Sequence, residues 1–100
     1  RVIEEKEHAE TSWFGGPIVC EEYKHRLVKY LETNKVQTRN YFAGNILMHP
    51  AYRHIEPASN YPNACKVLDN VFFVGCSPVI TEPMLEYIGE VVSNYISENY

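Results

Sequence analysis

Val71-Phe72-Phe73-Val74-Gly75-Cys76 is the stretch that decides the fold of this 100-residue chain. It is a continuous apolar run, rich in aromatic and β-branched residues, and Ser77-Pro78 closes it. A short run of this composition predicts a β-strand. Because neither face of the run is polar, we expect the strand to lie in the centre of a sheet.

The segment after this strand predicts the clearest helix of the sequence. Thr81 is a typical N-cap residue, and the apolar residues beyond it recur at intervals of three and four. The glutamates between them are expected to face water. The apolar positions are Met84, Leu85, Ile88, Val91, Val92, Tyr95 and Ile96, and the glutamates are Glu82, Glu86, Glu90 and Glu98.

The chain before the central strand predicts a short helix that follows an irregular segment. Residues 63–70 place Ala64, Val67 and Leu68 on one side of a helix. Residues 46–62 contain three prolines, which fix φ and remove backbone donors. We therefore expect irregular chain there, with one helical turn at most.

The first part of the chain predicts a strand followed by a helix. Residues 12–20 are aromatic and β-branched, and Gly15-Gly16 marks a bulge or bend within this strand. Glu21-Glu22 is expected to begin the helix, because acidic side chains favour helix N-termini. The apolar stripe of this helix consists of Tyr23, Leu27, Tyr30 and Leu31.

The helix is expected to end near Thr33, with Asn34 as a left-handed stop. Lys35-Val36-Gln37-Thr38 then alternates like a short strand. The order of these elements predicts an α+β fold, a small three-stranded sheet with helices packed on one face. Residues 12–100 are interpreted as one domain, and the charged residues 1–11 as a linker or the truncated end of a preceding element.

Composition excludes some classes of function. A net charge of −4 and a pI near 5.5 argue against a surface built for nucleic acid. No apolar run is long enough to cross a membrane and no secretion signal is visible, so we expect a cytoplasmic protein. Cys20, Cys65 and Cys76 lack the spacing of a zinc site, and we expect buried free thiols and no metal.

The loop Thr38-Arg39-Asn40-Tyr41-Phe42-Ala43-Gly44-Asn45 is the candidate functional site. Arg39 offers a planar set of five donors suited to phosphate or carboxylate, and Asn45 offers a donor and an acceptor. Gly44 allows backbone to come close to a ligand. The alternative is that Arg39 pairs with a surface carboxylate while Gly44 and Asn45 only turn the chain.

Several of these stretches together resemble the C-terminal end of the pyridoxal-phosphate-dependent nucleotide-sugar 3-dehydratases, within the DegT-type sugar aminotransferase family. The resemblance covers nearly the whole chain from residue 12, and the Thr-Arg-x-x-Phe-Ala-Gly-Asn string is its most specific part. The matching stretches, in order, are Ser12-Trp13-Phe14-Gly15, Leu27-Val28-Lys29-Tyr30-Leu31-Glu32, Thr38-Arg39 with Phe42-Ala43-Gly44-Asn45, Phe72-Phe73-Val74-Gly75 and Leu85-Glu86-Tyr87-Ile88.

The resemblance implies the small C-terminal domain of the aspartate-aminotransferase fold, without the large domain that binds the cofactor. The whole protein would be a homodimer that uses pyridoxal or pyridoxamine phosphate on CDP- or GDP-linked 4-keto-6-deoxyhexoses, in making dideoxysugars of lipopolysaccharide O-antigens. An iron–sulfur cluster is possible in its large domain. The catalytic base would also lie there, so the 100-residue chain alone is expected to be inactive and to hold no cofactor.

The resemblance also implies which residues contact cofactor or substrate. Phe14 looks like the aromatic residue near cofactor and sugar, although Trp13 and Phe14 also suit a core. Arg39, Phe42 and Asn45 occupy the family loop. The resemblance further implies that Trp13, Phe14 and Phe42 lie partly exposed on the side that would meet the large domain. Lys66 stands where related dehydratases tend to have arginine, so it would attract a phosphate without a bidentate grip, or else it is a solvated helix lysine.

Two other functions remain open from the sequence. The chain could be the same domain of a DegT-type aminotransferase, which has lysine where the dehydratases have histidine at the cofactor. It could also be a non-catalytic α+β binding module. None of His8, His25, His49 and His54 is expected to be that histidine, because all lie outside the large domain.

Overall fold

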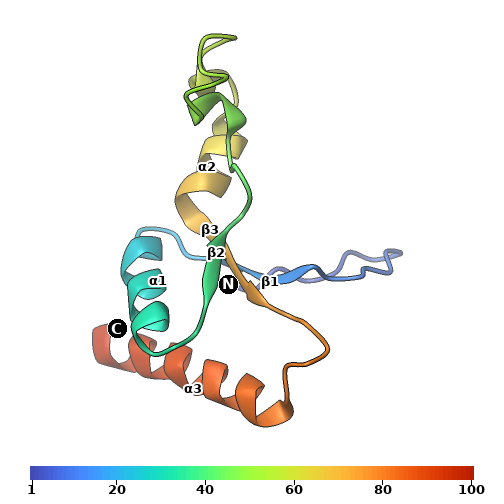
Figure 1. Ribbon diagram of the computed structural model, residues 1–100, viewed down its shortest axis with the longest axis vertical. Coiled ribbons are helices and arrows are strands. Elements are labelled where there is room, and N and C mark those ends of the chain that lie inside the picture. The colour runs from blue at the N-terminus through green and yellow to red at the C-terminus, as the bar shows by residue number, and fades with distance from the viewer.

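The computed structural model describes all 100 residues and has a three-stranded antiparallel sheet at its centre (Figure 1). Strands β1 (Gly15–Val19), β2 (Thr38–Asn40) and β3 (Val71–Gly75) are arranged in the order β1-β3-β2. The apolar run that predicted a central strand therefore forms one, and the α+β fold class is confirmed. In the β1–β3 pair Gly15 lies opposite Gly75, and in the β2–β3 pair Arg39 lies opposite Phe73.

Helices α1 (Lys24–Thr33) and α3 (Glu82–Asn99) cover one face of this sheet (Figure 1). Helix α2 (Pro62–Asn70) runs directly into β3 and extends away from the sheet. Beyond α2 lie two short 3₁₀ turns, η1 (Ile46–Met48) and η2 (Ala58–Asn60), so this segment has one helical turn more than the sequence predicts.

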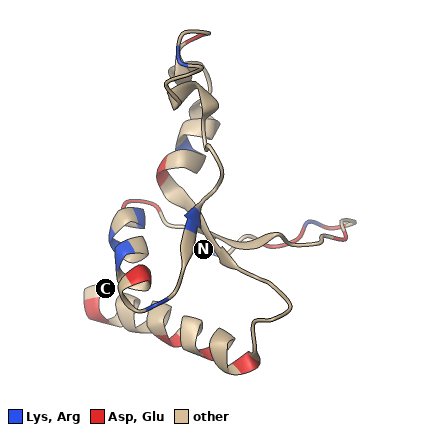
Figure 2. Cartoon of the chain, viewed as in Figure 1, with Lys and Arg blue, Asp and Glu red and all other residues tan.

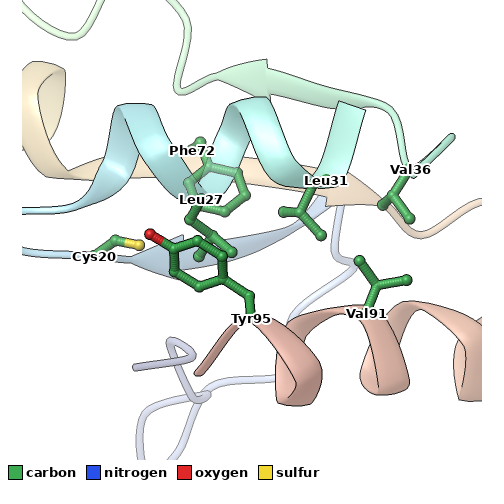
Figure 3. Close-up of a cluster of buried hydrophobic side chains, with 7 residues drawn as sticks. All are labelled: Cys20, Leu27, Leu31, Val36, Phe72, Val91 and Tyr95. Carbon is green, nitrogen blue, oxygen red and sulfur yellow. The ribbon is translucent and has the colours of Figure 1, made fainter. Parts of the chain in front are cut away.

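The core lies between the sheet and the two covering helices (Figure 3). Phe72 contributes from β3 and is fully buried, because alternation along a strand turns it toward the helices while Phe73 turns away. Burying one such side chain contributes about 1.5–3 kcal/mol. The core residues are Cys20, Leu27, Leu31, Val36, Phe72, Val91 and Tyr95.

The first helix begins later than the sequence predicts, and it ends at Thr33 as expected, although the left-handed residue after it is a different one. It begins at Lys24, after Glu22 takes a positive φ of 71°, so no acidic residue lies in its first turn. It ends where Lys35, not Asn34, is left-handed, with φ 65°. The Val36 N–H bonds the Leu31 carbonyl at 2.9 Å, and both side chains enter the core. This contact across the helix end selects the stop position.

The strand predicted over residues 12–20 is shorter and has no bend. It begins at Gly15, and its pairing with β3 is continuous from there to Val19. A Cβ added at Gly15 would lie 2.4 Å from a ring carbon of Phe73. Glycine is therefore needed at this position because an aromatic ring packs on the backbone.

The second strand is also displaced, from the predicted residues 35–38 to Thr38–Asn40. Its outer edge at Thr38 is occupied by Glu32 of α1, whose Oε1 accepts from the Thr38 N–H at 2.6 Å and from the Thr38 hydroxyl at 2.8 Å. These two bonds, the backbone bond first, lower the pKa of Glu32 below its ordinary value. The Thr38 N–H, which lies at the edge of the sheet, thus has the Glu32 side chain as its hydrogen-bond acceptor.

We predict that the Glu32–Thr38 link is lost in acid. Because the folded-state pKa is lowered, the stabilisation is complete above the ordinary carboxyl pKa and disappears as the pH falls through the lowered one. In an NMR titration the Thr38 amide should move with a midpoint below the ordinary glutamate value. Glu32→Gln should abolish that movement, and a midpoint at or above the ordinary value would contradict the assignment.

Helix α3 begins after Thr81, as predicted, but the Thr81 side chain makes no capping hydrogen bond. Three residues of its predicted apolar stripe, Met84, Leu85 and Ile96, are exposed, whereas Val91 and Tyr95 are buried. Part of the predicted apolar stripe therefore lies outside the core.

Tyr95 provides a test of this core. Its hydroxyl is buried without a hydrogen-bond partner, whereas the hydroxyl of Tyr87 on the same helix donates to the Asn34 carbonyl at 2.7 Å. Tyr95→Phe should raise the free energy of unfolding by about 1 kcal/mol, because a buried unpaired group is removed. Tyr87→Phe should lower it by about 0.5–1.5 kcal/mol. Equal effects in urea unfolding would show that the Tyr95 hydroxyl is paired.

Candidate functional site

The sheet face opposite α1 and α3 carries four aromatic rings, which we call the aromatic face: Phe14, Tyr41, Phe42 and Phe73. The rings of Phe14 and Phe42 are stacked with centroids 5.9 Å apart, and Phe73 lies 5.9 Å from Phe14 and 6.1 Å from Phe42. Tyr41 lies edge-on to Phe42 at 5.5 Å. Segments far apart in the sequence therefore supply one continuous aromatic surface.

Most of this surface faces solvent. Phe14 is 77% exposed and Phe42 68%, with the neighbouring Trp13 at 42%, whereas only Phe73 beneath them is buried. The prediction that these three aromatic residues lie partly in the open is confirmed, and the alternative that Trp13 and Phe14 belong to the core is wrong. Contiguous exposed rings of this kind mark a surface that binds a ligand or another part of a protein.

The backbone is strained where it presents one of these rings. Phe42 has a φ of 52°, and its N–H bonds the Asn40 carbonyl at 2.7 Å. A left-handed conformation of a bulky residue costs about 1–3 kcal/mol and is concentrated at functional sites. The turn after β2 thus holds an aromatic ring outward at an energetic cost.

Arg39 lies at the edge of the aromatic face. It borders a hollow of about 440 Å³ whose other lining residues are Phe14, Asn40, Phe42 and Phe73. Its guanidinium is exposed and has neither a carboxylate nor a hydrogen-bond partner, since the chain's only ion pair joins His8 to Glu7 at 3.4 Å. Most of the acidic residues lie in the N-terminal segment, just before α1 and on α3 (Figure 2). The alternative that Arg39 forms a surface ion pair is therefore wrong.

Asn45 is not beside Arg39, contrary to what a shared loop suggests. It is buried, and its Oδ1 caps η1 by accepting from the Leu47 N–H at 3.1 Å. Its Nδ2 donates to the Ala58 carbonyl at 3.1 Å and contacts the Cys65 Sγ at 3.3 Å. All its polar atoms are engaged within the chain, so a ligand contact by Asn45, which stays a prediction, would require one of these bonds to break.

Gly44 approaches helix α2. It has a φ of 64°, and an added Cβ would lie 2.6 Å from the Leu68 Cβ and 2.7 Å from the Leu68 Cα. The space beside Gly44 was predicted to be open to a ligand, but Leu68 of α2 fills it. This contact and the bonds of Asn45 fix the loop against α2, and they hold Tyr41 and Phe42 in place.

Lys66 lies apart from the other predicted site residues. It is exposed on α2, makes no hydrogen bond, and lines neither of the hollows that Arg39 borders. The structure brings together Phe14, Arg39 and Phe42 only. Whether Lys66 contacts a ligand stays a prediction.

Two residues that matter at this site were missed by sequence reasoning. The sequence places Tyr41 only within the loop. Its position next to Phe42, shortly before Gly44, could have indicated that it belongs to the same aromatic surface. Lys24 is buried, and its Nζ donates to the Leu68 carbonyl at the end of α2 at 2.6 Å. Burial lowers the pKa of Lys24, and the charge of Asp69 opposes this shift. A lysine at the start of an amphipathic helix gives no sign of this burial.

Some expectations on cysteines, metals and membranes can be compared with the structure. Cys20 is buried and Cys65 half-buried, but Cys76 is exposed, so the prediction of three buried thiols is wrong. Cys76 follows the last residue of β3, where the chain leaves the sheet, and its Sγ contacts the Trp13 carbonyl at 3.0 Å. No group of three or more potential metal-binding side chains occurs. None of the helices has the length and hydropathy needed to cross a bilayer.

The chain is thus a small α+β domain whose sheet is covered by helices on one face and presents aromatic rings and an unpaired arginine on the other. The chain belongs to the DegT/DnrJ/EryC1/StrS aminotransferase family, whose sequence profile matches residues 1–93.

Two relatives are similar over nearly the whole chain. One is the dTDP-4-dehydro-2,6-dideoxy-D-glucose 3-dehydratase of Saccharopolyspora spinosa, 33% identical over 92% of this chain. The other is the lipopolysaccharide biosynthesis protein RfbH of Salmonella typhimurium, 28% identical over 97% of this chain. The chain spans 21% of the length of the first relative and 24% of the second. The resemblance to nucleotide-sugar 3-dehydratases is thus confirmed.

Proposed function

We propose that this chain is part of a nucleotide-sugar 3-dehydratase, a lyase that uses pyridoxal or pyridoxamine phosphate. Its substrate would be a nucleotide-linked 4-keto-6-deoxyhexose, on the way to a dideoxysugar of a lipopolysaccharide O-antigen. Residues 12–100 would form the small domain that closes over the site, and a large domain would supply the rest. The observation that carries this proposal is the exposed aromatic face with an unpaired Arg39 at its edge.

The residues present suit one wall of such a site. The exposed rings of Phe14 and Phe42 can pack against a sugar or pyridine ring and exclude water from it. The Arg39 guanidinium can donate two parallel hydrogen bonds to a phosphate. When bound, pyridoxal phosphate supplies an electron sink for removal of the C3 hydroxyl.

We infer that the proton-transfer group comes from outside this chain. The hollow beside Arg39 is lined by no histidine, lysine, aspartate or glutamate. The chain's own residues would thus bind and orient, and a histidine of the large domain would act as the base. A homodimer and an iron–sulfur cluster in the large domain are further parts of the proposal for the whole protein.

The test is the reaction of the whole protein, with pyridoxamine phosphate, on CDP-, GDP- and dTDP-linked 4-keto-6-deoxyhexoses. Loss of the C3 hydroxyl, followed by mass spectrometry and NMR of the sugar, is expected for one of them. The family name also favours a second function, amino transfer to the sugar. A 4-amino sugar as the product, together with lysine at the cofactor position, would establish that function instead.

A further inference from the structure

A second cavity lies where the sheet meets the first half of α3, and it shares Arg39 and Phe73 with the hollow of the aromatic face. We call it the α3 groove. It has a volume of about 510 Å³ and is lined from three sides, by the chain entering β2, by the end of β3 with Ile80, and by α3. The lining residues are Lys35, Val36, Gln37, Arg39, Phe73, Val74, Gly75, Ile80, Pro83, Met84, Tyr87 and Ile88.

The floor and walls of the α3 groove are mostly apolar, whereas its polar residues lie along one rim. Lys35, Gln37 and Arg39 alternate with Val36 and Thr38, and all three are exposed. Lys35 lies in the turn after α1, with φ 65°, and Gln37 and Arg39 follow it along the chain that enters and forms β2. The groove thus joins an apolar interior to a polar edge, as ligand sites commonly do.

The charge of this rim is opposite to that of the chain. The net charge of the chain is −4, yet no aspartate or glutamate lines the α3 groove, and Lys35 and Arg39 form no ion pair. Two unpaired cations beside apolar walls attract an anion and repel a cation, and an uncharged occupant gains nothing from them.

The walls are held by contacts within the chain. The Tyr87 hydroxyl bonds the Asn34 carbonyl at 2.7 Å, which joins α3 to the end of α1 beside Lys35. Ile80 Cδ1 would be 3.6 Å from a Cβ on Gly75, so the connection before α3 packs on the end of β3. An extended peptide is disfavoured as occupant, because Glu32 already engages the edge of β2 at Thr38.

We propose that the α3 groove binds an amphipathic organic anion. Its apolar body, an acyl chain or an aromatic ring system, lies against Ile80, Met84 and Ile88. Its carboxylate or sulfonate head lies at Lys35 and Arg39. The volume is within the range of about 300–1,000 Å³ usual for small-molecule sites. The α3 groove shares Arg39 and Phe73 with the hollow of the aromatic face, but Lys35, Ile80, Met84 and Ile88 line the groove alone and distinguish the two sites.

The test is NMR titration of the 100-residue chain with decanoate, and with 1-decanol as the uncharged control. Decanoate should move the amide signals of Val74, Gly75 and Ile80 saturably, and decanol should bind several-fold more weakly. Equal affinity for the two, movement confined to Phe14 and Phe42, or no movement would each overturn the proposal. If only the amide signals of Phe14 and Phe42 moved, decanoate would be binding at the site of the proposed function and not in the α3 groove.

Two matched pairs of variants localise the site. Met84 lines the α3 groove and Leu85 does not, although both are about half exposed on α3. Met84→Glu should raise the Kd for decanoate at least about tenfold by like-charge repulsion, and Leu85→Glu should leave it nearly unchanged. Lys35→Gln should raise it about two- to fivefold, and Lys29→Gln on α1 should not. Equal effects within either pair would overturn the proposal.

Discussion

Gly44→Ala is expected to lower the free energy of unfolding by about 2–5 kcal/mol. Two effects add here. A residue with a Cβ at φ 64° is in the left-handed region, which costs about 1–2 kcal/mol. The new Cβ also overlaps the Leu68 side chain at 2.6 Å and the Leu68 backbone at 2.7 Å, and relief of such overpacking costs about 1–3 kcal/mol.

Gly89→Ala is the matched control for this prediction. Gly89 lies within helix α3, and an added Cβ there meets nothing within 4 Å. Alanine should therefore stabilise the chain by about 0.5–1 kcal/mol through helix propensity. Urea unfolding of both variants measures the difference. A neutral Gly44→Ala would mean that the loop does not pack on α2, and that another contact holds Tyr41 and Phe42 in place.

In the whole protein, Arg39→Ala is expected to lower kcat/KM by about 10- to 150-fold while Tm stays nearly unchanged. The change removes a charge-assisted contact worth about 1.5–3 kcal/mol with a phosphate of cofactor or substrate. Stability should be spared because Arg39 has no partner within the chain. Arg39→Lys should recover only part of the activity, since the charge remains but the planar set of donors does not.

Arg26→Ala is the control for loss of an arginine. Arg26 is an exposed residue of α1, on the other side of the sheet from the aromatic face, and its Nη2 lies 3.5 Å from the Tyr100 hydroxyl. Its removal should leave kcat/KM unchanged. If Arg39→Ala instead lowered Tm and spared kcat/KM, Arg39 would be structural, and the proposed site would have to lie elsewhere.

The elements with strong local patterns could be predicted from the sequence. The apolar run at Val71–Gly75 became the central strand, and the helical spacing of Leu27 and Leu31 and of Val91 and Tyr95 placed those side chains in the core. Periodicity is enough to predict which side chains are buried, because it shows which side of a helix or strand is apolar even when the segment that packs against that side is unknown. The exposure of Phe14 and Phe42 came from the resemblance, which assigned them to a surface that another domain meets.

The strand boundaries and the partners of the polar residues were decided by tertiary structure. Arg39 belongs to β2 because it pairs with Phe73, about 34 positions further along the chain, and no local pattern encodes that pairing. Asn45 and Lys24 resembled surface residues, yet both are buried because η2 and α2 supply carbonyl acceptors for them. The sequence specifies the chemistry of each side chain. Its burial and its hydrogen-bond partner depend on which distant segments come into contact, and those contacts form only in the folded structure.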